Sequence, residues 1–318
     1  METILVPTDF SEDARHALGY AIEMAQVTGS RIVLFHAFYQ PLSFPSAADY
    51  AAVVRELERG KTLALEAYAQ EAQLSLLQGS TLARKSAVSA YQGREVHPLA
   101  NDGARHTETA GDAPTEMPAA DLRCVCKFGF AFDEILKAVE AQRADLVVMG
   151  MRGGGALRRA LLGRTTLSVM RGAHVPVLAI PLHARFEVFK SVVFAADLAN
   201  LPARREVAML GEFVRAFHAR LQVLHLYKGE MGQQEEEQAA ASLETLGECL
   251  PDIDYNVTFR QREDTADAIE QFMRQRHGDL LVLMPLRHTF LEMLLNKSLT
   301  QRMMARAFVP LLALPSGA

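Results

Sequence analysis

A glycine-rich segment near the middle of the chain has the residue types and spacing of a phosphate-binding loop. It follows the apolar run Leu146–Met149 directly, and glycines occur at Gly150, Gly153 and Gly163. Glycines at the first two positions permit a tight turn and let backbone amides approach an anion closely. Gly163 precedes a predicted helix whose first N–H groups and dipole favour a phosphate. The alternative interpretation is a glycine-rich loop that only turns the chain.

Two arginines and a threonine in this segment could contact a bound phosphate. Arg152 lies between the first two glycines and would make the mouth of a pocket positive, and Thr165 offers a hydroxyl just after Gly163. Arg164 stands between Gly163 and Thr165, where its guanidinium could donate to phosphate or its bulk could obstruct the site. We favour the interpretation in which Arg164 is compatible with phosphate binding.

The elements that must position this segment alternate between apolar runs and helical stretches. Apolar residues at helical spacing predict helices over Ala14–Gln26, Asp49–Leu77 and Asp133–Ala141. Strands that are apolar on both faces, each followed by a helix, indicate a parallel sheet covered on both sides. Right-handed crossovers bring the strand ends to one edge, where ligands bind in open α/β sheets. The predicted fold class is therefore α/β.

The chain also repeats itself, which predicts two domains of the same fold, 1–183 and 186–318. Three blocks recur in the same order: 3–9 with 191–197, 32–37 with 221–226, and 145–181 with 279–315. The last pair aligns without a gap at an offset of 134. The block that opens each copy ends in an aspartate, which is Asp9 in the first copy and Asp197 in the second.

The second copy loses the glycines of the first. At the offset of 134 their positions are occupied by Met284, Arg287 and Lys297. Side chains there would fill the space in which backbone amides meet a phosphate. We therefore expect no ATP in the second domain.

An insertion distinguishes the first copy. The offset between the copies falls from 189 at His36 to 134 at Asp145, so the first copy carries 55 extra residues. Most of this excess falls in Gln78–Asp121, which is rich in glycine and proline and has little apolar periodicity. Such a composition buries too little surface to offset the entropy of ordering. The sequence predicts a mobile, disordered loop there.

The last strand of each copy would leave an apolar edge exposed if the domains stood apart. These strands are Val177–Ile180 and Leu311–Leu314. Pairing them with each other would bury both edges. We expect the two domains to pack as an intramolecular pseudo-dimer, and the sequence leaves a further homo-oligomer open.

The opening residues Ile4–Ser11 closely resemble the first strand and turn of the universal stress protein family. Gly150, Gly153 and Gly163 match that family's GxxGx9G(S/T) ATP-binding motif, and the resemblance covers nearly the whole chain except the insertion. It implies a tandem family member with two Rossmann-like, adenine nucleotide alpha hydrolase-like domains. It also implies an adenine nucleotide, ATP first, as the ligand of the first domain.

The resemblance assigns further residues to that nucleotide site. Thr8 and Asp9 would lie at the end of the first strand beside the nucleoside, and Ala37 would touch the adenine. The glycines would cradle the phosphates, and Thr165 would continue the contact. The chain departs from the family motif at Arg164, where a serine or threonine usually follows the last glycine.

Charge and composition narrow the function classes. The formal net charge of −5 argues against a general nucleic-acid binder, because binding to the phosphate backbone of a nucleic acid needs a surplus of Lys and Arg. The sequence shows no secretion signal and no long apolar run, so a cytoplasmic protein without membrane contact is expected. Its three cysteines form no metal-ligand or disulfide pattern.

Three function hypotheses remain open. The leading one is a cytoplasmic stress-response sensor or adaptor that binds ATP in the first domain. The second is a slow ATPase in which Asp9 helps hold Mg²⁺ and Gln78–Asp121 closes as a lid. The third is a nucleotide-free scaffold whose site Arg164 has closed. No catalytic nucleophile or base is placed by the sequence, which makes an enzyme the weaker expectation.

Overall fold

The computed structural model describes residues 1–41, 47–92, 121–152, 162–201, 203–262, 264–284 and 309–315. Gly153, Arg287 and Lys297 were singled out from the sequence and lie outside the described residues. For the end of helix α2, from residue 77 to 92, the backbone is described without its side chains.

Strands and helices alternate through the first unit as the repeat predicts. Its elements are β1 (Thr3–Pro7), α1 (Glu12–Thr28), β2 (Arg31–Phe38), α2 (Ala47–Gln92), β3 (Leu122–Phe128), α3 (Ala131–Ala141), β4 (Leu146–Gly150), α4 (Arg164–Gly172) and β5 (Val177–Ile180).

The described part of the second unit repeats this order with an added 3₁₀ helix after its first strand, and residues 285–308, between its last two strands, lie outside the described residues. This unit contains β6 (Ser191–Ala196), the 3₁₀ helix η1 (Leu198–Asn200), α5 (Arg204–Ala216), β7 (Arg220–Tyr227), α6 (Gln233–Cys249), β8 (Tyr255–Gln261), α7 (Thr265–Gln275), β9 (Leu280–Leu283) and β10 (Leu311–Ala313).

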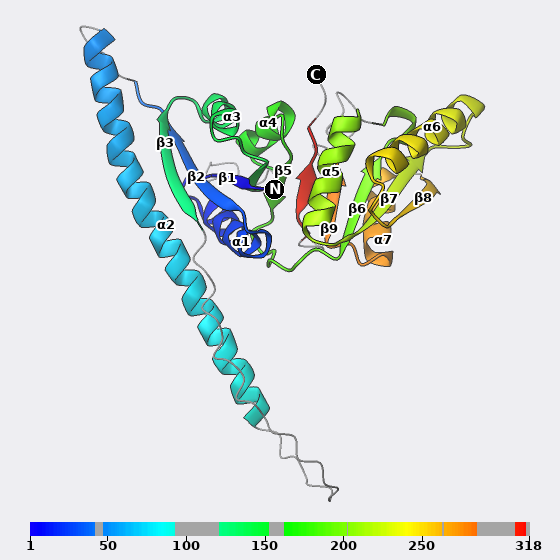
Figure 1. Cartoon of the computed structure of the whole chain (residues 1–318), viewed down its shortest axis with the longest axis horizontal. Helices are drawn as coiled ribbons and strands as arrows, with labels where there is room; N and C mark the ends of the chain where they lie inside the picture. Colours follow the sequence, from blue (N-terminus) through cyan, green and yellow to red (C-terminus); the bar gives the residue numbers. More distant parts are fainter. Residues whose placement is uncertain are drawn as a thin grey trace, which may run out of the picture.

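The ten strands of the described residues form one sheet in the order β3-β2-β1-β4-β5-β10-β9-β6-β7-β8. Every neighbouring pair is parallel except β5 and β10, which run antiparallel with Leu178 opposite Leu312. The two units thus lie side by side along one sheet (Figure 1). The predicted α/β fold with open, mostly parallel sheets is confirmed.

The strands are apolar on both faces because helices cover both faces of the sheet. Alternate residues of β1 illustrate this, since Ile4 packs into one core cluster and Leu5 into the other. The first cluster includes residues of α1, α2, α5 and α6, and the second includes residues of α3, α4 and α7. A period of two in a parallel strand therefore supplies both hydrophobic layers.

Helix α2 corrects one expectation from the sequence. The predicted loop Gln78–Asp121 is wrong for residues 78–92, because α2 continues to Gln92. Gly79 lies within this helix, and one glycine in a helix costs only about 1 kcal/mol relative to alanine. The neighbouring Leu, Ala, Arg and Lys residues are good helix formers, and they outweigh that cost. Residues 93–120 lie outside the described part of the chain.

An aspartate ties the start of each unit to the sheet. The Asp145 carboxylate accepts hydrogen bonds from the backbone amides of Glu2 and Thr3, at 2.6 and 2.9 Å. Asp279, its counterpart at the offset of 134, accepts from the amides of Lys190 and Ser191. The same tether in both units explains why the longest repeated block begins with an aspartate.

We predict that Asp145→Ala lowers the free energy of unfolding by about 1–3 kcal/mol, because it leaves the Glu2 and Thr3 amides without their acceptor. Because Thr3 is buried, water cannot easily take the place of the carboxylate as acceptor for the Thr3 amide. Urea denaturation monitored by circular dichroism measures the change. Asp145→Asn keeps one side-chain acceptor and should lose less. Equal stability of wild type and Asp145→Ala would contradict the tether.

Candidate functional site

The carboxyl ends of β1, β2 and β4 meet at one edge of the first unit. The sheet order β3-β2-β1-β4-β5 reverses direction between β1 and β4, which is where open α/β sheets bind ligands. Several residues singled out from the sequence reach this edge along different elements: Thr8 and Asp9 after β1, Ala37 in β2, Gly150 at the end of β4, and Arg164 and Thr165 at the start of α4.

The turn after β1 is held by its own side chains. Thr8 is buried, and its hydroxyl accepts a hydrogen bond from the amide of Phe10 at 3.0 Å. Asp9 accepts from the amide of Ser11 at 3.0 Å and stays exposed. Phe10 adopts a φ of 63°, in the left-handed region, between these two bonds. Thr8 therefore stabilises the turn, and the turn places Asp9 at the surface.

The first turn of α4 has the features of an anion site. Gly163 occupies the N-cap position and provides no side-chain cap, and the first turn contains no acidic residue. The amides of the first helical residues have no partner within a helix, so Arg164 and Thr165 present N–H groups at its positive end. By contrast, the Ser11 hydroxyl caps α1 by accepting from the amide of Ala14.

Thr166 fixes this helix end to the sheet, a role that the sequence did not reveal. Its buried hydroxyl donates to the carbonyl of Gly150 at 3.0 Å. The amide of Gly163 also donates to the carbonyl of Met151 at 2.6 Å. Both bonds hold the start of α4 beside the end of β4. The only signal in the sequence was the second hydroxyl of the pair that follows Arg164.

Asp13 is a second residue that the sequence analysis missed. A Cβ atom added to Gly150 would lie 2.7 Å from the backbone carbon and oxygen of Asp13. Glycine is thus required because the first turn of α1 packs directly on the end of β4. The Asp13 carboxylate also lies 3.3 Å from Nε of Arg152, so an ion pair holds this arginine toward α1.

His36 belongs to the opposite face of the sheet from Ala37. Ala37 packs against the core cluster beneath α3 and α4. The His36 Nδ1 lies 2.8 Å from the Thr8 carbonyl oxygen, which can only accept, so Nδ1 carries the proton. Its ring lies 4.6 Å from that of Phe10, and Phe10 lies 5.1 Å from Tyr68 of α2. His36 therefore supports the turn after β1 from behind.

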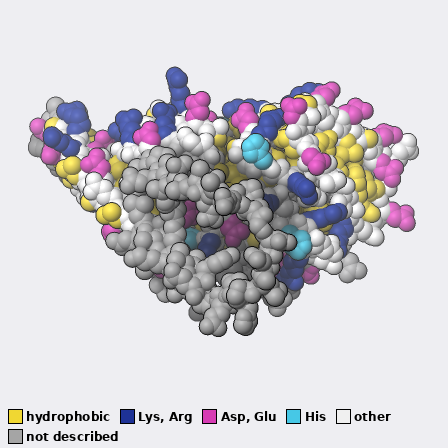
Figure 2. Space-filling model, turned by 60° about the horizontal axis from the view of Figure 1, so that its bottom comes forward, with side chains coloured by type: hydrophobic (Ala, Val, Ile, Leu, Met, Phe, Trp, Pro, Cys, Tyr) yellow, Lys and Arg dark blue, Asp and Glu magenta, His cyan; other side chains and the backbone are white. Residues whose placement is uncertain are grey.

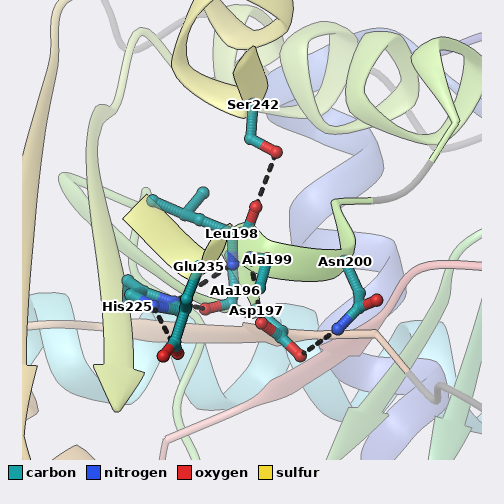
Figure 3. A network of polar contacts seen from close by, with 8 residues as sticks. All are labelled: Ala196, Asp197, Leu198, Ala199, Asn200, His225, Glu235 and Ser242. Carbon is teal, nitrogen blue, oxygen red and sulfur yellow. Dashed lines mark hydrogen bonds and ion pairs between the residues drawn. The ribbon is translucent and has the colours of Figure 1, made fainter. Parts of the chain in front are cut away.

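The equivalent turn in the second unit is closed by its own contacts (Figure 3). Asp197 accepts from the amide of Ala199 with one oxygen and from the Asn200 side chain with the other. His225 is fully buried, and its Nδ1 accepts from the amide of Leu198 at 3.1 Å. Asp9 and Asp197 thus make the same bond to the amide two residues on, and Asp197 adds the bond to Asn200 and is less exposed than Asp9.

The end of β9 also differs from the end of β4. Met284 stands where the first unit has Gly150, and its side chain is buried in the core. A side chain at this position fills the space that Gly150 leaves for the first turn of α1. The residues after it, 285–308, lie outside the described part of the chain.

Charge, metal ligands and long apolar helices would mark other kinds of site. On the face seen in Figure 2, both Lys or Arg and Asp or Glu side chains occur among the described residues. No three or more His, Cys, Asp or Glu side chains in the described ranges gather as a metal site. Within those ranges, no helix has the length and apolar character needed to cross a membrane.

We predict that Gly150→Ala destabilises the protein by about 1–3 kcal/mol, because the new methyl group meets the Asp13 backbone, which cannot move freely. Gly60→Ala in α2 is the matched control, since a Cβ there meets no atom within 4 Å. Thermal or urea unfolding should show a loss for Gly150→Ala and no loss for Gly60→Ala. Equal effects would refute the packing role of Gly150.

A second prediction concerns pH. Burial lowers the pKa of His36 below its ordinary value of about 6.5, against the opposing effect of its bond to Thr8. The unfolded chain therefore binds the proton more readily, and the contribution of His36 is complete above about pH 6.5 and is lost as pH falls. His36→Gln should weaken the fall in unfolding free energy between about pH 7.5 and 5. Identical pH profiles of the two proteins would exclude this role.

Comparison with known proteins agrees with this fold. The model of the universal stress protein family matches residues 1–181. A universal stress protein from Methanocaldococcus jannaschii is 24% identical over 177 residues, covering 56% of this chain and 93% of that protein. One from Thermus aquaticus is 29% identical over 181 residues, covering 56% of this chain and 98% of that protein.

A solved structure extends the likeness in fold to both units. A universal stress protein from Archaeoglobus fulgidus aligns over 99% of this chain and 97% of its own, with a TM-score of 0.56 and 15% identity. The family model covers the unit that contains Asp9, Gly150 and the start of α4. This chain belongs to the universal stress protein family.

Proposed function

We propose that the first unit binds an adenine nucleotide, with ATP as the first candidate, at the edge formed by β1, β2 and β4. The observation that carries this proposal is the N-terminus of α4. It has no side-chain cap and no acidic residue in its first turn, and an arginine opens the helix. A helix end of this kind favours phosphate through amides that no carbonyl of the helix itself can pair, and through its dipole.

The position of Arg164 supports binding over a closed site. Arg164 and Thr165 are both exposed at the start of α4, so neither side chain is buried across the helix end. The guanidinium can therefore add a charge-assisted hydrogen bond to a phosphate oxygen. This arrangement favours a nucleotide-binding protein over the nucleotide-free scaffold.

The nucleoside would lie toward β1 and β2. Asp9 is exposed at the end of β1, where its carboxylate can accept hydrogen bonds from ribose hydroxyls. Ala37 is small and only partly buried on the face that α3 and α4 cover, and we place the base against it. Gly150, Arg152, Gly153 and Gly163 complete the proposed phosphate side.

The second unit would act as an intramolecular partner that binds no nucleotide. Asp197 already caps η1, and Met284 fills the position of Gly150. The antiparallel pair β5–β10 joins this unit to the first, which supports an intramolecular pseudo-dimer. Within the universal stress protein family, we propose a cytoplasmic stress-response role as a sensor or adaptor, in which nucleotide occupancy of the first unit is the signal.

We predict that Gly163→Asp weakens nucleotide binding at least tenfold (roughly 1.4 kcal/mol) without destabilising the protein. The new carboxylate would accept from the amides of the first turn of α4 and would repel phosphate from the same place. Gly163 has a φ of −63°, so an aspartate fits the backbone there. Isothermal titration with ATP should show this loss of affinity, while the melting temperature stays level or rises.

Two control variants sharpen this test. Arg171→Gln removes an exposed arginine from the last turn of α4 and should bind ATP like wild type. Arg164→Gln removes the one at the first turn and should bind ATP more weakly. If wild type binds no adenine nucleotide, or if Gly163→Asp binds it as wild type does, the proposed site is wrong.

A further inference from the structure

The two outer edges of the ten-stranded sheet differ in what lies beside them. Strand β3 ends the sheet on one side, and α2 lies along it. There Glu58 accepts a hydrogen bond from the amide of Phe128 at 3.1 Å and pairs with Lys127 at 3.2 Å. Strand β8 ends the sheet on the other side, at the right in Figure 1, and pairs among the described residues with β7 alone.

The ladder between β7 and β8 decides which backbone groups of β8 face outward. The amide of Leu221 donates to the carbonyl of Asp254, and the amide of Arg262 donates to the carbonyl of Tyr227. In a parallel ladder, alternate residues turn both backbone groups toward the neighbouring strand. The even-numbered residues of β8 therefore bond to β7, and the outward-facing groups belong to Tyr255, Val257, Phe259 and Gln261.

The outward-facing residues also carry most of the apolar side chains of this edge. Tyr255 and Val257 pack partly against the core cluster beneath α5 and α6. Phe259 follows on the same face and is 41% exposed. On the other face, Arg260 donates to Gln271 and Gln275 of α7, so its guanidinium is held back against the unit. A bare ladder beside an exposed aromatic ring is a surface for strand pairing.

We propose that two copies of this chain associate through antiparallel pairing of their β8 edges, centred on Thr258. In this register Thr258 faces Thr258, Val257 faces Phe259, and Asn256 faces Arg260. No two like charges oppose each other, and the threonine and apolar pairs are ones that stabilise antiparallel sheets. The strand is thus complementary to itself.

A second copy suits this edge better than an unrelated strand for two reasons. The chain already joins its two units by antiparallel pairing of equivalent strands, β5 with β10. A two-fold axis at Thr258 would repeat that arrangement and continue the sheet into the partner. Both outer ends of the enlarged sheet would then be β3 edges lined by α2, so association would stop at a dimer.

The contact is short, so the dimer should be weak and depend on concentration. The strand has seven residues, and interfaces of this size fall at the low end of specific association. Sedimentation velocity over roughly 5–200 µM should show wild type passing from monomer to dimer. Val257→Pro removes one outward amide and leaves the β7 ladder intact, and Phe259→Lys breaks the apolar pair. Both variants should stay monomeric while retaining the wild-type circular dichroism spectrum.

Cysteine crosslinking tests the register directly. At the axis the two Thr258 residues form a non-hydrogen-bonded pair, with Cα atoms about 4.5 Å apart, close enough for a disulfide. Mild oxidation should therefore crosslink Thr258→Cys into a dimer. Asn256→Cys is the matched control, because its cysteine would face Arg260 and should not crosslink above wild type, which has Cys124, Cys126 and Cys249.

The outcomes are distinct. A dimer that Val257→Pro and Phe259→Lys abolish, with crosslinking at position 258 and not at 256, supports the pairing. A monomer at every concentration, a dimer that both variants retain, or equal crosslinking at the two positions overturns it. ATP binding in the first unit does not enter this test, so either proposal can fail without the other.

Discussion

The antiparallel pair of β5 and β10 is the contact on which the arrangement of the molecule depends. Both strands are buried along their whole length, and each would be an apolar edge if its unit stood alone. Their pairing turns two short parallel sheets into one sheet of ten strands. The outer edges of the sheet are then β3, along which α2 lies, and β8, which pairs among the described residues with β7 alone. The duplication therefore has a structural use that does not require two binding sites.

Within the first unit, the candidate site depends on how closely α1, β4 and α4 approach one another. Gly150 lets the backbone of Asp13 come near the end of β4, and Thr166 ties the start of α4 to the Gly150 carbonyl. The first contact requires a glycine, whereas the second uses only the backbone carbonyl of this residue. The second unit places buried Met284 at this position and uses Asp197 as a helix cap. The two units thus differ at the ends of β4 and β9, whereas the residues of the second unit that align with α4 lie outside the described part of the chain.

Much of the fold and part of the site could be predicted from the sequence. The repeated blocks, the buried strands and the α/β class follow from apolar patterns of local period, which act over a few residues. The segment from Gly150 to Thr165 could be recognised because its glycines are spaced along one stretch of chain. The prediction for residues 78–92 was wrong, because it gave the glycine there more weight than the helix-forming residues around it, whereas the structure continues α2 to Gln92.

The sequence by itself determined the α/β class, and it contains repeated blocks of which the second set lacks the three glycines and ends its first block at Asp197 as the first set does at Asp9. Only the tertiary structure decided what those residues touch. Asp13 and Gly150, or Thr8 and His36, are far apart in the chain, and no local pattern records that they meet. Packing across the sheet brought His36 against the turn that Thr8 shapes, placed Asp13 on Gly150, and gave β8 no strand neighbour other than β7 among the described residues.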